Sequence, residues 1–323
     1  MTSRLSLAAE DGLFDASDAA TVIFGARASD DLTSFDPSKT TVVQGMWPDH
    51  KALLQRGFET VVDAPDTADI AVVLLPRSKG LARHWIAQAM QIAKSRVIVD
   101  GQKTDGIDSL ARELRTMGTV IDSFAKAHGK TVVLEPGAAL PGWLDPAPRK
   151  TTTGFYTRQG VFSADRIDPG SRLFAAALPR LVGHVVDLGA GWGYLSHHIL
   201  VQNSVSILDL VEADKSALDC AKLNVPDPRA SFHWADARDW RPSGAVDVVV
   251  SNPPFHTGRK AEPDLGIAFI TSAARILAPK GSLFLVANRH LPYEAALVEH
   301  FKDVEEIDGD PAYKILRGTR PRR

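Results

Sequence analysis

Short runs of apolar, often β-branched residues alternate with segments of helical hydrophobic period along most of the chain. Such apolar runs are typical of strands buried on both faces, and the amphipathic segments predict helices that cover a parallel sheet. The first half predicts strands at 21–24, 41–44, 60–62, 70–75 and 96–99, and helices at 49–56, 81–94 and 107–117. The second half predicts strands at 184–187, 206–211, 231–234, 246–250 and 282–287, and helices at 195–202, 215–223, 265–277 and 292–301. We therefore expect an α/β fold.

The two halves look like copies of one fold. Residues 68–77 parallel residues 245–254, and residues 95–101 parallel residues 281–287. A chain of 323 residues also exceeds the usual size of one core. Pro, Gly and Thr accumulate over 135–160 and break both periodicities. The pattern predicts a first domain at 1–140, a Pro/Gly-rich linker at 141–157 and a second domain at 158–323.

Composition excludes several classes of protein. The chain is 44% hydrophobic and 24% charged, as in an ordinary globular protein, and no apolar run is long enough for a membrane helix. The N-terminus lacks the apolar core of a signal peptide, and the single cysteine, Cys220, fits a reducing compartment. We expect a cytoplasmic monomer that needs neither a membrane nor a metal.

The charge of the chain permits an RNA substrate without requiring one. A net charge of −2 is not that of a protein held to nucleic acid by a broad basic surface. Basic residues do cluster locally, although each cluster alone is equally well explained as a solvated face. The clusters comprise Arg149, Lys150, Arg158 and Arg166, and the C-terminal Arg317, Arg320, Arg322 and Arg323.

A glycine turn follows the first strand of the second half, as Asp187-Leu188-Gly189-Ala190-Gly191-Trp192-Gly193. A dinucleotide fingerprint would need glycine at position 194, which is tyrosine. The pattern is instead that of the nucleoside-binding turn of methyltransferases that use S-adenosylmethionine, although a generic tight turn is the alternative. Glycines let the backbone pass close to a cofactor, and Asp187 is a candidate for orienting its methionine portion.

Two further acids end the next strands. Glu212, followed by Ala213, closes one strand, where a carboxylate can accept both ribose hydroxyls. Asp236 follows the third strand and can accept a hydrogen bond from the adenine amine, while Ala237 leaves room for the ring. Alone, Glu212 would be a solvated acid and Asp236 a cap. Together with the turn they predict a site for S-adenosylmethionine in the crevice at the strand ends.

The segment Asn252-Pro253-Pro254-Phe255 directly follows the apolar run 246–250. An exocyclic amine on a base is a poor nucleophile because its lone pair is delocalised. The Asn252 side-chain oxygen and the Pro253 carbonyl could accept both N–H groups and stabilise the charge that develops on nitrogen. The prolines restrict the backbone, and Phe255 could stack on the base. These four residues are the catalytic candidates, whereas an ordinary turn after a strand is the alternative.

Two other segments bear on the site. Phe162 could close over the cofactor or a flipped base, or it could be a core residue that anchors the linker. In the first half, Gly25-Ala26-Arg27 lacks the glycine triplet and Leu75-Pro76-Arg77 lacks an Asn. We therefore expect the first domain to be a degenerate copy that binds substrate or shields the catalytic one, or else a structural partner.

The second half resembles the bacterial ribosomal RNA small-subunit guanine-N2 methyltransferases, which have tandem methyltransferase-like domains. The resemblance rests on matching segments at 160–163, 168–171, 187–193, 251–258, 286–288 and 291–293. It implies two Rossmann-like class I domains, of which the second transfers a methyl group from S-adenosylmethionine to the N2 amine of a guanosine. The implied partner is ribosomal RNA or the small ribosomal subunit, with relatives that act on the large subunit.

Three other functions are open. Protein glutamine N5-methyltransferases also use Asn-Pro-Pro with an aromatic residue, usually Tyr, but they carry a helical N-terminal domain. A DNA adenine N6-methyltransferase would need a separate recognition domain and a more basic surface. A non-enzymatic RNA-binding module is disfavoured because the second half keeps both acids and all three glycines.

Overall fold

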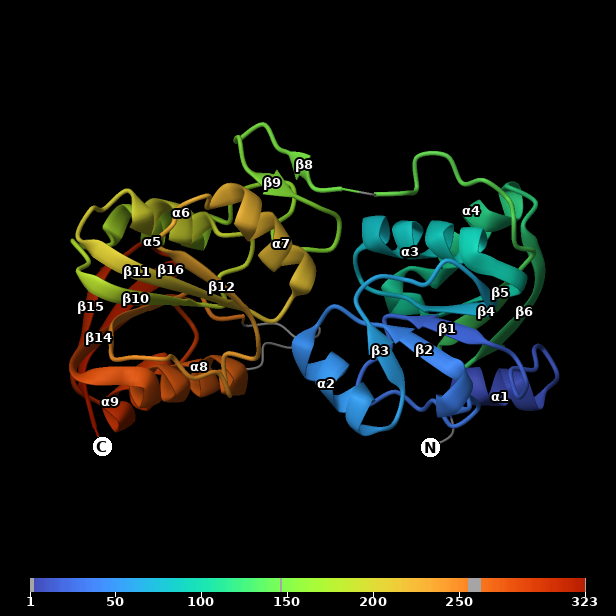
Figure 1. Ribbon diagram of the computed structural model, residues 1–323, viewed down its shortest axis with the longest axis horizontal. Coiled ribbons are helices and arrows are strands. Elements are labelled where there is room, and N and C mark those ends of the chain that lie inside the picture. Colours follow the sequence, from blue (N-terminus) through green and yellow to red (C-terminus); the bar gives the residue numbers. More distant parts are fainter. Residues whose placement is uncertain (1–2, 146, 255–262, 323) are drawn as a thin grey trace. The chain divides into compact units, whose positions relative to one another are not determined.

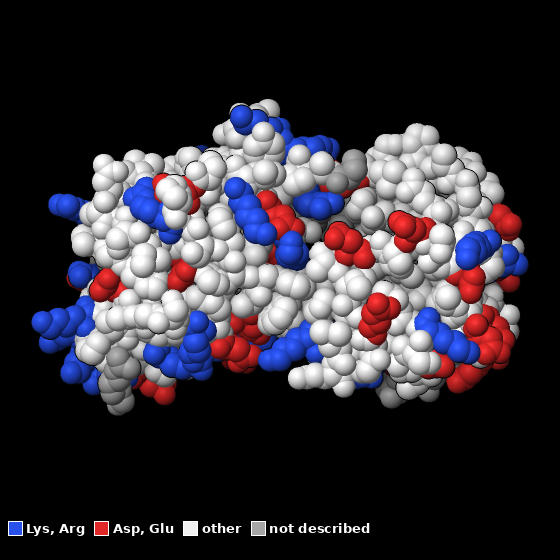
Figure 2. Space-filling view, viewed as in Figure 1, with Lys and Arg blue, Asp and Glu red and all other residues white. Residues whose placement is uncertain are grey.

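The computed structural model describes residues 3–145, 147–254 and 263–322 and divides into two compact units, Met1–Ala147 and Pro148–Arg323 (Figure 1). Unit 1 holds the first seven-stranded sheet and unit 2 the second. Acidic and basic side chains are interspersed over the face shown in Figure 2, without one continuous basic area.

Unit 1 contains four α-helices and seven strands among its described residues. The helices are α1 (Arg4–Glu10), α2 (Trp47–Gln55), α3 (Lys79–Ile92) and α4 (Ile107–Thr116), with 3-10 turns at Pro37–Lys39 and Lys103–Asp105. The strands are β1 (Thr21–Phe24), β2 (Thr40–Val43), β3 (Glu59–Val61), β4 (Ala68–Leu74), β5 (Ala93–Gln102), β6 (Val120–Lys126) and β7 (Gly129–Leu134).

Unit 2 repeats this arrangement and adds a small hairpin before it. The helices are α5 (Pro169–Ala177), α6 (Tyr194–Leu200), α7 (Lys215–Asn224), α8 (Pro263–Ile276) and α9 (Tyr293–His300). The sheet strands are β10 (Gly183–Leu188), β11 (Val205–Glu212), β12 (Ala230–Trp234), β13 (Val246–Ser251), β14 (Leu277–Asn288), β15 (Phe301–Gly309) and β16 (Tyr313–Pro321). The hairpin consists of β8 (Arg149–Lys150) and β9 (Tyr156–Thr157).

The two sheets have the same strand order. Unit 1 runs β3-β2-β1-β4-β5-β7-β6 and unit 2 runs β12-β11-β10-β13-β14-β16-β15. In each sheet the first five strands of this order are parallel to one another. The last two strands are added at one edge by antiparallel pairing. The prediction that the halves are two α/β copies of one fold is confirmed.

The register of the sheets corrects one detail of that correspondence. Phe24 lies opposite Val73, as Leu188 lies opposite Ser251. Residue 73 therefore corresponds to 251, and the predicted alignment of 68–77 with 245–254 is wrong by one position. The error matters because a shift of one residue exchanges the two faces of a strand. The alignment of 95–101 with 281–287 is confirmed, since Val99 pairs with Val73 and Leu285 with Ser251.

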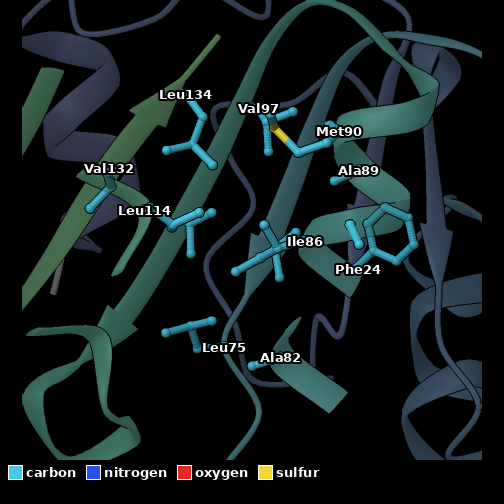
Figure 3. Close-up of a cluster of buried hydrophobic side chains, with 14 of the residues drawn as sticks. Phe24, Leu75, Ala82, Ile86, Ala89, Met90, Val97, Leu114, Val132 and Leu134 are labelled. Atoms are coloured by element: carbon cyan, nitrogen blue, oxygen red, sulfur yellow. The ribbon is translucent and has the colours of Figure 1, made fainter. Parts of the chain in front are cut away.

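Helices on both sides of each sheet bury the strands, which explains their continuous apolar runs. In unit 1 the α3 residues Ala82, Ile86, Ala89 and Met90 pack on strand residues such as Phe24 (Figure 3). In unit 2 one core lies under α5, α6 and α7, and another lies under α8 and α9. In the described residues, no helix is both long enough and apolar enough to cross a membrane.

Every predicted strand and helix is present, with ends that differ by a few residues. The elements that the pattern did not predict are α1, α5, the β6–β7 and β15–β16 pairs, and the β8–β9 hairpin. The hairpin lies within the predicted linker, yet it is bound to unit 2, because the Tyr156 N–H donates to Asn224 Oδ1 at 2.7 Å. Asn224 Nδ2 in turn donates to the Tyr156 carbonyl at 2.8 Å.

Candidate active site

A pocket with about 400 Å³ of empty space opens in unit 2 where β10 and β13 end. Carboxyl ends of adjacent parallel strands are the usual place for a ligand in an open α/β sheet. The pocket is lined by Phe162, Ser163, Asp168, Ser171, Gly189, Ala190, Gly191, Trp192, Tyr194, Leu195 and Asn252. It therefore brings together the glycine turn, the segment that precedes α5 and the residue that follows β13.

The glycines of the turn have different surroundings. Gly191 has φ +55°, and a Cβ there would meet only open space on the pocket side. Gly193 has φ +88°, and a Cβ there would lie 2.9 Å from Val225 Cγ2 and 3.2 Å from Ala221 Cβ. Gly191 therefore leaves room for a ligand, whereas Gly193 leaves room for α7.

Asp187 lies behind the turn rather than in the pocket. Its side chain is fully buried, and its Oδ2 accepts a hydrogen bond from Ser196 Oγ at 2.7 Å. Its Oδ1 has no hydrogen-bond partner among the described residues. Burial raises the pKa of Asp187 to about 6, against the opposing effect of the Ser196 hydrogen bonds. Asp187 is therefore not among the residues that line the pocket, and its side-chain contact is with Ser196 of α6.

Glu212 links the end of β11 to the turn. Its Oε2 accepts from the Gly191 N–H at 2.7 Å, and its Oε1 accepts from the Asp214 N–H at 2.8 Å. Burial raises the pKa of this half-buried carboxyl to about 7, although the hydrogen bonds lower it. The carboxylate therefore stands beside Gly191 with further lone pairs for the hydroxyls of a ribose.

The third acid is held by its own loop. Asp236 is 8% exposed, and Arg238 Nε donates to its Oδ1 at 3.0 Å and its Oδ2 at 2.9 Å. Ala237 is buried, and its carbonyl accepts from Ser272 Oγ at 2.5 Å. The carbonyl of Ala213 accepts from Trp234 Nε1 at 2.9 Å. Glu212, Ala213, Asp236 and Ala237 do not line the pocket; only Glu212 contacts the turn directly.

Asn252 follows β13 and has a fixed orientation. Its Nδ2 donates to Ser171 Oγ at 2.8 Å and to Asp168 Oδ2 at 3.2 Å. Because a carboxylate only accepts hydrogen bonds, this contact also decides which atom of the amide is nitrogen. The Ser251 hydroxyl anchors the strand end by donating to the Leu188 carbonyl at 2.7 Å. Oδ1 of Asn252 is thereby left as an acceptor at the pocket.

The residues after Asn252 are described only in part. Pro253 is buried and Pro254 is exposed. Phe255, the fourth catalytic candidate, lies outside the described residues, and so does His256.

Phe162 lines the pocket with 57% of its side chain exposed, so it is not a core residue. Its carbonyl accepts from Trp192 Nε1 at 2.9 Å, and the Trp192 carbonyl accepts from Asn224 Nδ2 at 2.8 Å. Since Asn224 also binds Tyr156, one chain of hydrogen bonds joins the hairpin, the glycine turn and the Phe162 segment.

Two further residues at the pocket, Asp168 and Ser171, were not among the predicted site residues. Asp168 is the N-cap of α5, and its Oδ2 accepts from the Ser171 N–H at 2.7 Å. The signal was present as Asp168-Pro169 before a helical pattern, because Asp at the N-cap and Pro at the first position start helices. Their contact with Asn252 spans more than 80 residues of sequence, which no local pattern could predict.

Unit 1 contains the same positions without the site. Gln44 corresponds to Glu212, and its Oε1 accepts from the Met46 N–H at 2.7 Å while its Nε2 donates to the Ala26 carbonyl at 2.7 Å. Leu74, the last residue of β4, corresponds to Asn252, and its side chain can neither donate nor accept a hydrogen bond. The side-chain amide of Gln44 thus bonds backbone groups on both sides, where Glu212 has lone pairs free for a ligand. This difference agrees with the prediction that the first copy is degenerate.

The arrangement in unit 2 fits a nucleoside-containing cofactor better than a metal. Among the described residues, no group of three or more His, Cys, Asp and Glu side chains is arranged to hold a metal ion. An open face at Gly191, a carboxylate beside it and an oriented amide oxygen across the pocket suit a ligand with an amino acid and a ribose.

Comparisons with known proteins agree with this geometry. A family model, the methyltransferase small domain, matches residues 152–317. The chain is 30% identical over 280 residues to ribosomal RNA small subunit methyltransferase C of Shewanella piezotolerans, covering 81% of this chain and 80% of that protein. It is 29% identical to ribosomal RNA large subunit methyltransferase G of Streptomyces coelicolor, covering 79% of this chain and 73% of that protein.

A solved structure shares the whole two-unit fold. It is the 16S rRNA N2 G1207 methyltransferase of T. thermophilus, in complex with AdoMet and guanosine. The TM-score is 0.79 at 22% sequence identity, with 93% of this chain and 88% of that chain covered.

Proposed function

The chain belongs to the methyltransferase small domain family, and from this premise we propose that it methylates the exocyclic N2 amine of a guanosine in small-subunit ribosomal RNA. The observation that carries the proposal is the oriented amide of Asn252, whose two N–H groups are bound by Asp168 and Ser171. The names of the full-length relatives support the choice of ribosomal RNA. S-Adenosylmethionine is the proposed cofactor and supplies an electrophilic methyl group when bound.

The catalytic role proposed for Asn252 follows from its surroundings. Oδ1 of Asn252 and the backbone carbonyl of Pro253 accept the two N–H groups of the guanine amine and turn its lone pair toward the methyl donor. The amine becomes positive as it accepts the methyl group, and two fixed acceptors stabilise that charge without having to reorganise. Pro254 restricts the backbone that presents the carbonyl, and Phe255 provides a face for the base.

The cofactor-binding roles are proposed for the turn and the strand ends. Gly189, Ala190 and Gly191 form the surface against which the cofactor lies, Gly193 lets the turn pack against α7, and Glu212 accepts the ribose hydroxyls. Asp187 holds the turn from behind through Ser196. Ala213, Asp236 and Ala237 flank the adenine, and Phe162 covers the pocket from the open side.

The rest of the proposal concerns the cellular setting. The second domain, 158–323 with its preceding linker, carries catalysis, and the domain at 1–140 assists substrate binding or stability. The enzyme acts in the cytoplasm as a monomer on ribosomal RNA or on the small subunit.

The test is transfer of a labelled methyl group from S-adenosylmethionine to defined substrates. Purified protein is incubated with unmodified 16S rRNA, assembled small subunits, 23S rRNA or a peptide release factor, and the methyl group is mapped by mass spectrometry. We expect a methyl on guanine N2 of 16S rRNA. The Asn252→Ala variant should bind the cofactor nearly as well but turn over about 10²-fold more slowly.

Each of the other substrates tests one of the alternative functions. Labelling of 23S rRNA alone would support the large-subunit alternative, which the Streptomyces relative favours. A methyl on the glutamine of the release factor would replace guanosine as the substrate. If no substrate accepted the label although the protein bound S-adenosylmethionine, the proposed reaction would be wrong.

A further inference from the structure

Two segments of unit 2 are rich in basic residues, 148–180 and the C-terminal 311–323, which has five Lys and Arg and no acid. The unit as a whole has 22 Lys and Arg against 20 Asp and Glu residues. Residues 148–180 contribute six of these basic residues and only two acids, Asp165 and Asp168. The segment therefore has a net charge of +4, while the remainder of unit 2 has a net charge of −2. Unit 1, with 15 basic and 19 acidic residues, has a net charge of −4.

Four of the six cations in 148–180 are exposed and take part in no ion pair among the described residues; one of them, Arg180, lies just before β10, near Ser204, and the other three lie earlier in the segment. In the described part of the chain, Lys150, Arg166 and Arg172 are exposed and take part in no ion pair. The arginines of the C-terminal strands differ in this respect. Arg317 pairs with Glu305 at 3.0 Å, and Arg320 pairs with Asp303. We refer to Lys150, Arg166 and Arg172 as the basic strip.

Two members of the strip adjoin the pocket. Arg166 follows the lining segment, and its carbonyl accepts from the hydroxyl of the lining residue Ser163 at 2.7 Å. Arg172 lies in the first turn of α5, next to the lining residue Ser171, and its N–H donates to the carbonyl of Asp168 at 2.9 Å. Both residues therefore lie in the stretch of chain that lines the pocket and holds Asn252.

Lys150 lies on the hairpin, beside an aromatic ring. Its Nζ lies 5.8 Å from the ring centroid of Tyr156, which is bound through Asn224 to the glycine turn. The exposed ring of Phe162 lies in the same segment. Figure 2 shows Lys and Arg side chains around the hairpin that Figure 1 draws above α7. Cations interleaved with aromatic rings are the usual surface for single-stranded nucleic acid.

We propose that the basic strip binds the RNA phosphates that flank the target nucleotide. This inference rests on the proposed function and deepens it by assigning the phosphate contacts beside the target nucleotide to the catalytic unit. Each cation replaces counterions along the phosphate backbone, so the strip contributes affinity that falls with salt and carries little sequence information. The oriented Asn252 then selects the base that enters the pocket.

The test removes three charges at a time. The triple variant Lys150→Gln/Arg166→Gln/Arg172→Gln is compared with a control triple variant, Arg180→Gln/Lys280→Gln/Lys302→Gln. The control residues are exposed and lie at the amino edge of the sheet, near Ser204, the start of β14 and the start of β15. Binding of an unmodified 16S rRNA transcript is measured over a range of salt concentrations, together with cofactor affinity and the kinetics of methyl transfer.

We expect the strip variant to reduce the slope of log affinity against log salt by about 2, since each phosphate contact on a single strand contributes about 0.7. The KM for RNA should rise at least about tenfold at physiological salt, with kcat at saturating RNA and cofactor affinity unchanged. The control variant should keep the wild-type slope and KM.

Unchanged slope and KM in the strip variant would overturn the inference, and so would an equal effect of the control variant. A loss of cofactor affinity would also overturn it, because the strip would then serve the cofactor. RNA binding is measured without turnover. A wild-type protein that fails to methylate RNA therefore refutes the proposed function separately from the assignment of the strip.

Discussion

Asn252 is held by two residues that line the pocket with it, Asp168 and Ser171. The Asp168 side chain caps α5 and also accepts from Asn252 Nδ2, so the same carboxylate starts a helix and orients an amide. Ser171 supplies the second acceptor. Without these contacts the amide could rotate and present nitrogen, a donor, where the proposed reaction needs an acceptor.

We predict that Asp168→Ser separates capping from orientation. Serine is as good an N-cap as aspartate, so the free energy of unfolding should change by less than about 0.5 kcal/mol. Its shorter side chain should not reach Asn252, and kcat should fall about tenfold while the KM for RNA stays constant. Steady-state kinetics and denaturant unfolding measure the two effects.

The matched control is Ser78→Ala, which removes the N-cap of α3 in unit 1. That change should cost about 1 kcal/mol of stability and leave kcat unchanged. If Asp168→Ser lost stability but kept its kcat, Asp168 would be a helix cap and nothing more.

Glu212 gives a second prediction at the residue scale, a pH dependence of cofactor binding. Burial raises the pKa of its carboxyl to about 7, so the acid is mostly protonated at pH 6 and mostly ionised at pH 8. Only the ionised form can accept from the Gly191 N–H, the Asp214 N–H and two ribose hydroxyls together. Affinity for S-adenosylmethionine should therefore increase about tenfold from pH 6 to pH 8.

Calorimetric titration at several pH values measures this dependence. Glu212→Gln should bind more weakly and should lose the change in affinity between pH 6 and 8. A wild-type affinity that stayed constant over this range would show that the ribose is not bound by the ionised carboxylate.

Among the elements of unit 2, the glycine turn must both leave space for a ligand and pack against α7. Both Gly191 and Gly193 have positive φ, yet one faces the pocket and the other faces α7. We predict that Gly191→Ala lowers cofactor affinity at least about tenfold, because its Cβ projects into the space for the ligand. Gly193→Ala should instead lower the melting temperature more, because its Cβ meets Val225 and Ala221.

Thermal unfolding and cofactor titration of both variants measure the difference. Backbone strain is common to the two substitutions, so it serves as the internal control. Equal losses of affinity and stability in both would show that strain, rather than position, governs the turn.

The elements also show what a sequence pattern can and cannot predict. The central strands β1, β4, β10 and β13 were predictable because both faces are largely buried and each strand contains a run of β-branched or other apolar residues. The edge strands β6 and β15 were missed because most of their residues are exposed. A strand exposed in this way has no apolar period to detect.

The candidate site was also predictable only in part. The turn, Glu212 and Asn252 follow strand ends that the pattern located. Asp168 and Ser171 come together with Asn252 only through the fold. The position of Asp187 behind the turn could not be predicted either, since it depends on which face of β10 the side chain takes and on Ser196 in the following helix.

At the scale of the whole molecule, each unit has its own sheet and its own buried cores. We predict that calorimetry will show two unfolding transitions, because separate cores unfold as separate cooperative units. S-Adenosylmethionine at one hundred times its Kd should stabilise only unit 2, by about 2.7 kcal/mol. Scanning calorimetry with and without the cofactor measures the shift.

Gly193→Ala identifies the two transitions independently. It should lower the melting temperature of only one transition, the same one whose melting temperature the cofactor raises. A single transition that moves as a whole in both experiments would show that the two cores unfold together.

Neither sheet borrows a strand from the other half: the strands of the first all precede Pro148, and those of the second all follow it. During synthesis, the first sheet can thus be completed by its β6–β7 pair before β10 has left the ribosome. Tandem domains of identical topology risk exchanging strands while they fold, and early completion of the first sheet removes its central strands from that competition. The order of strands along the chain thereby protects a protein built from two like halves against misassembly.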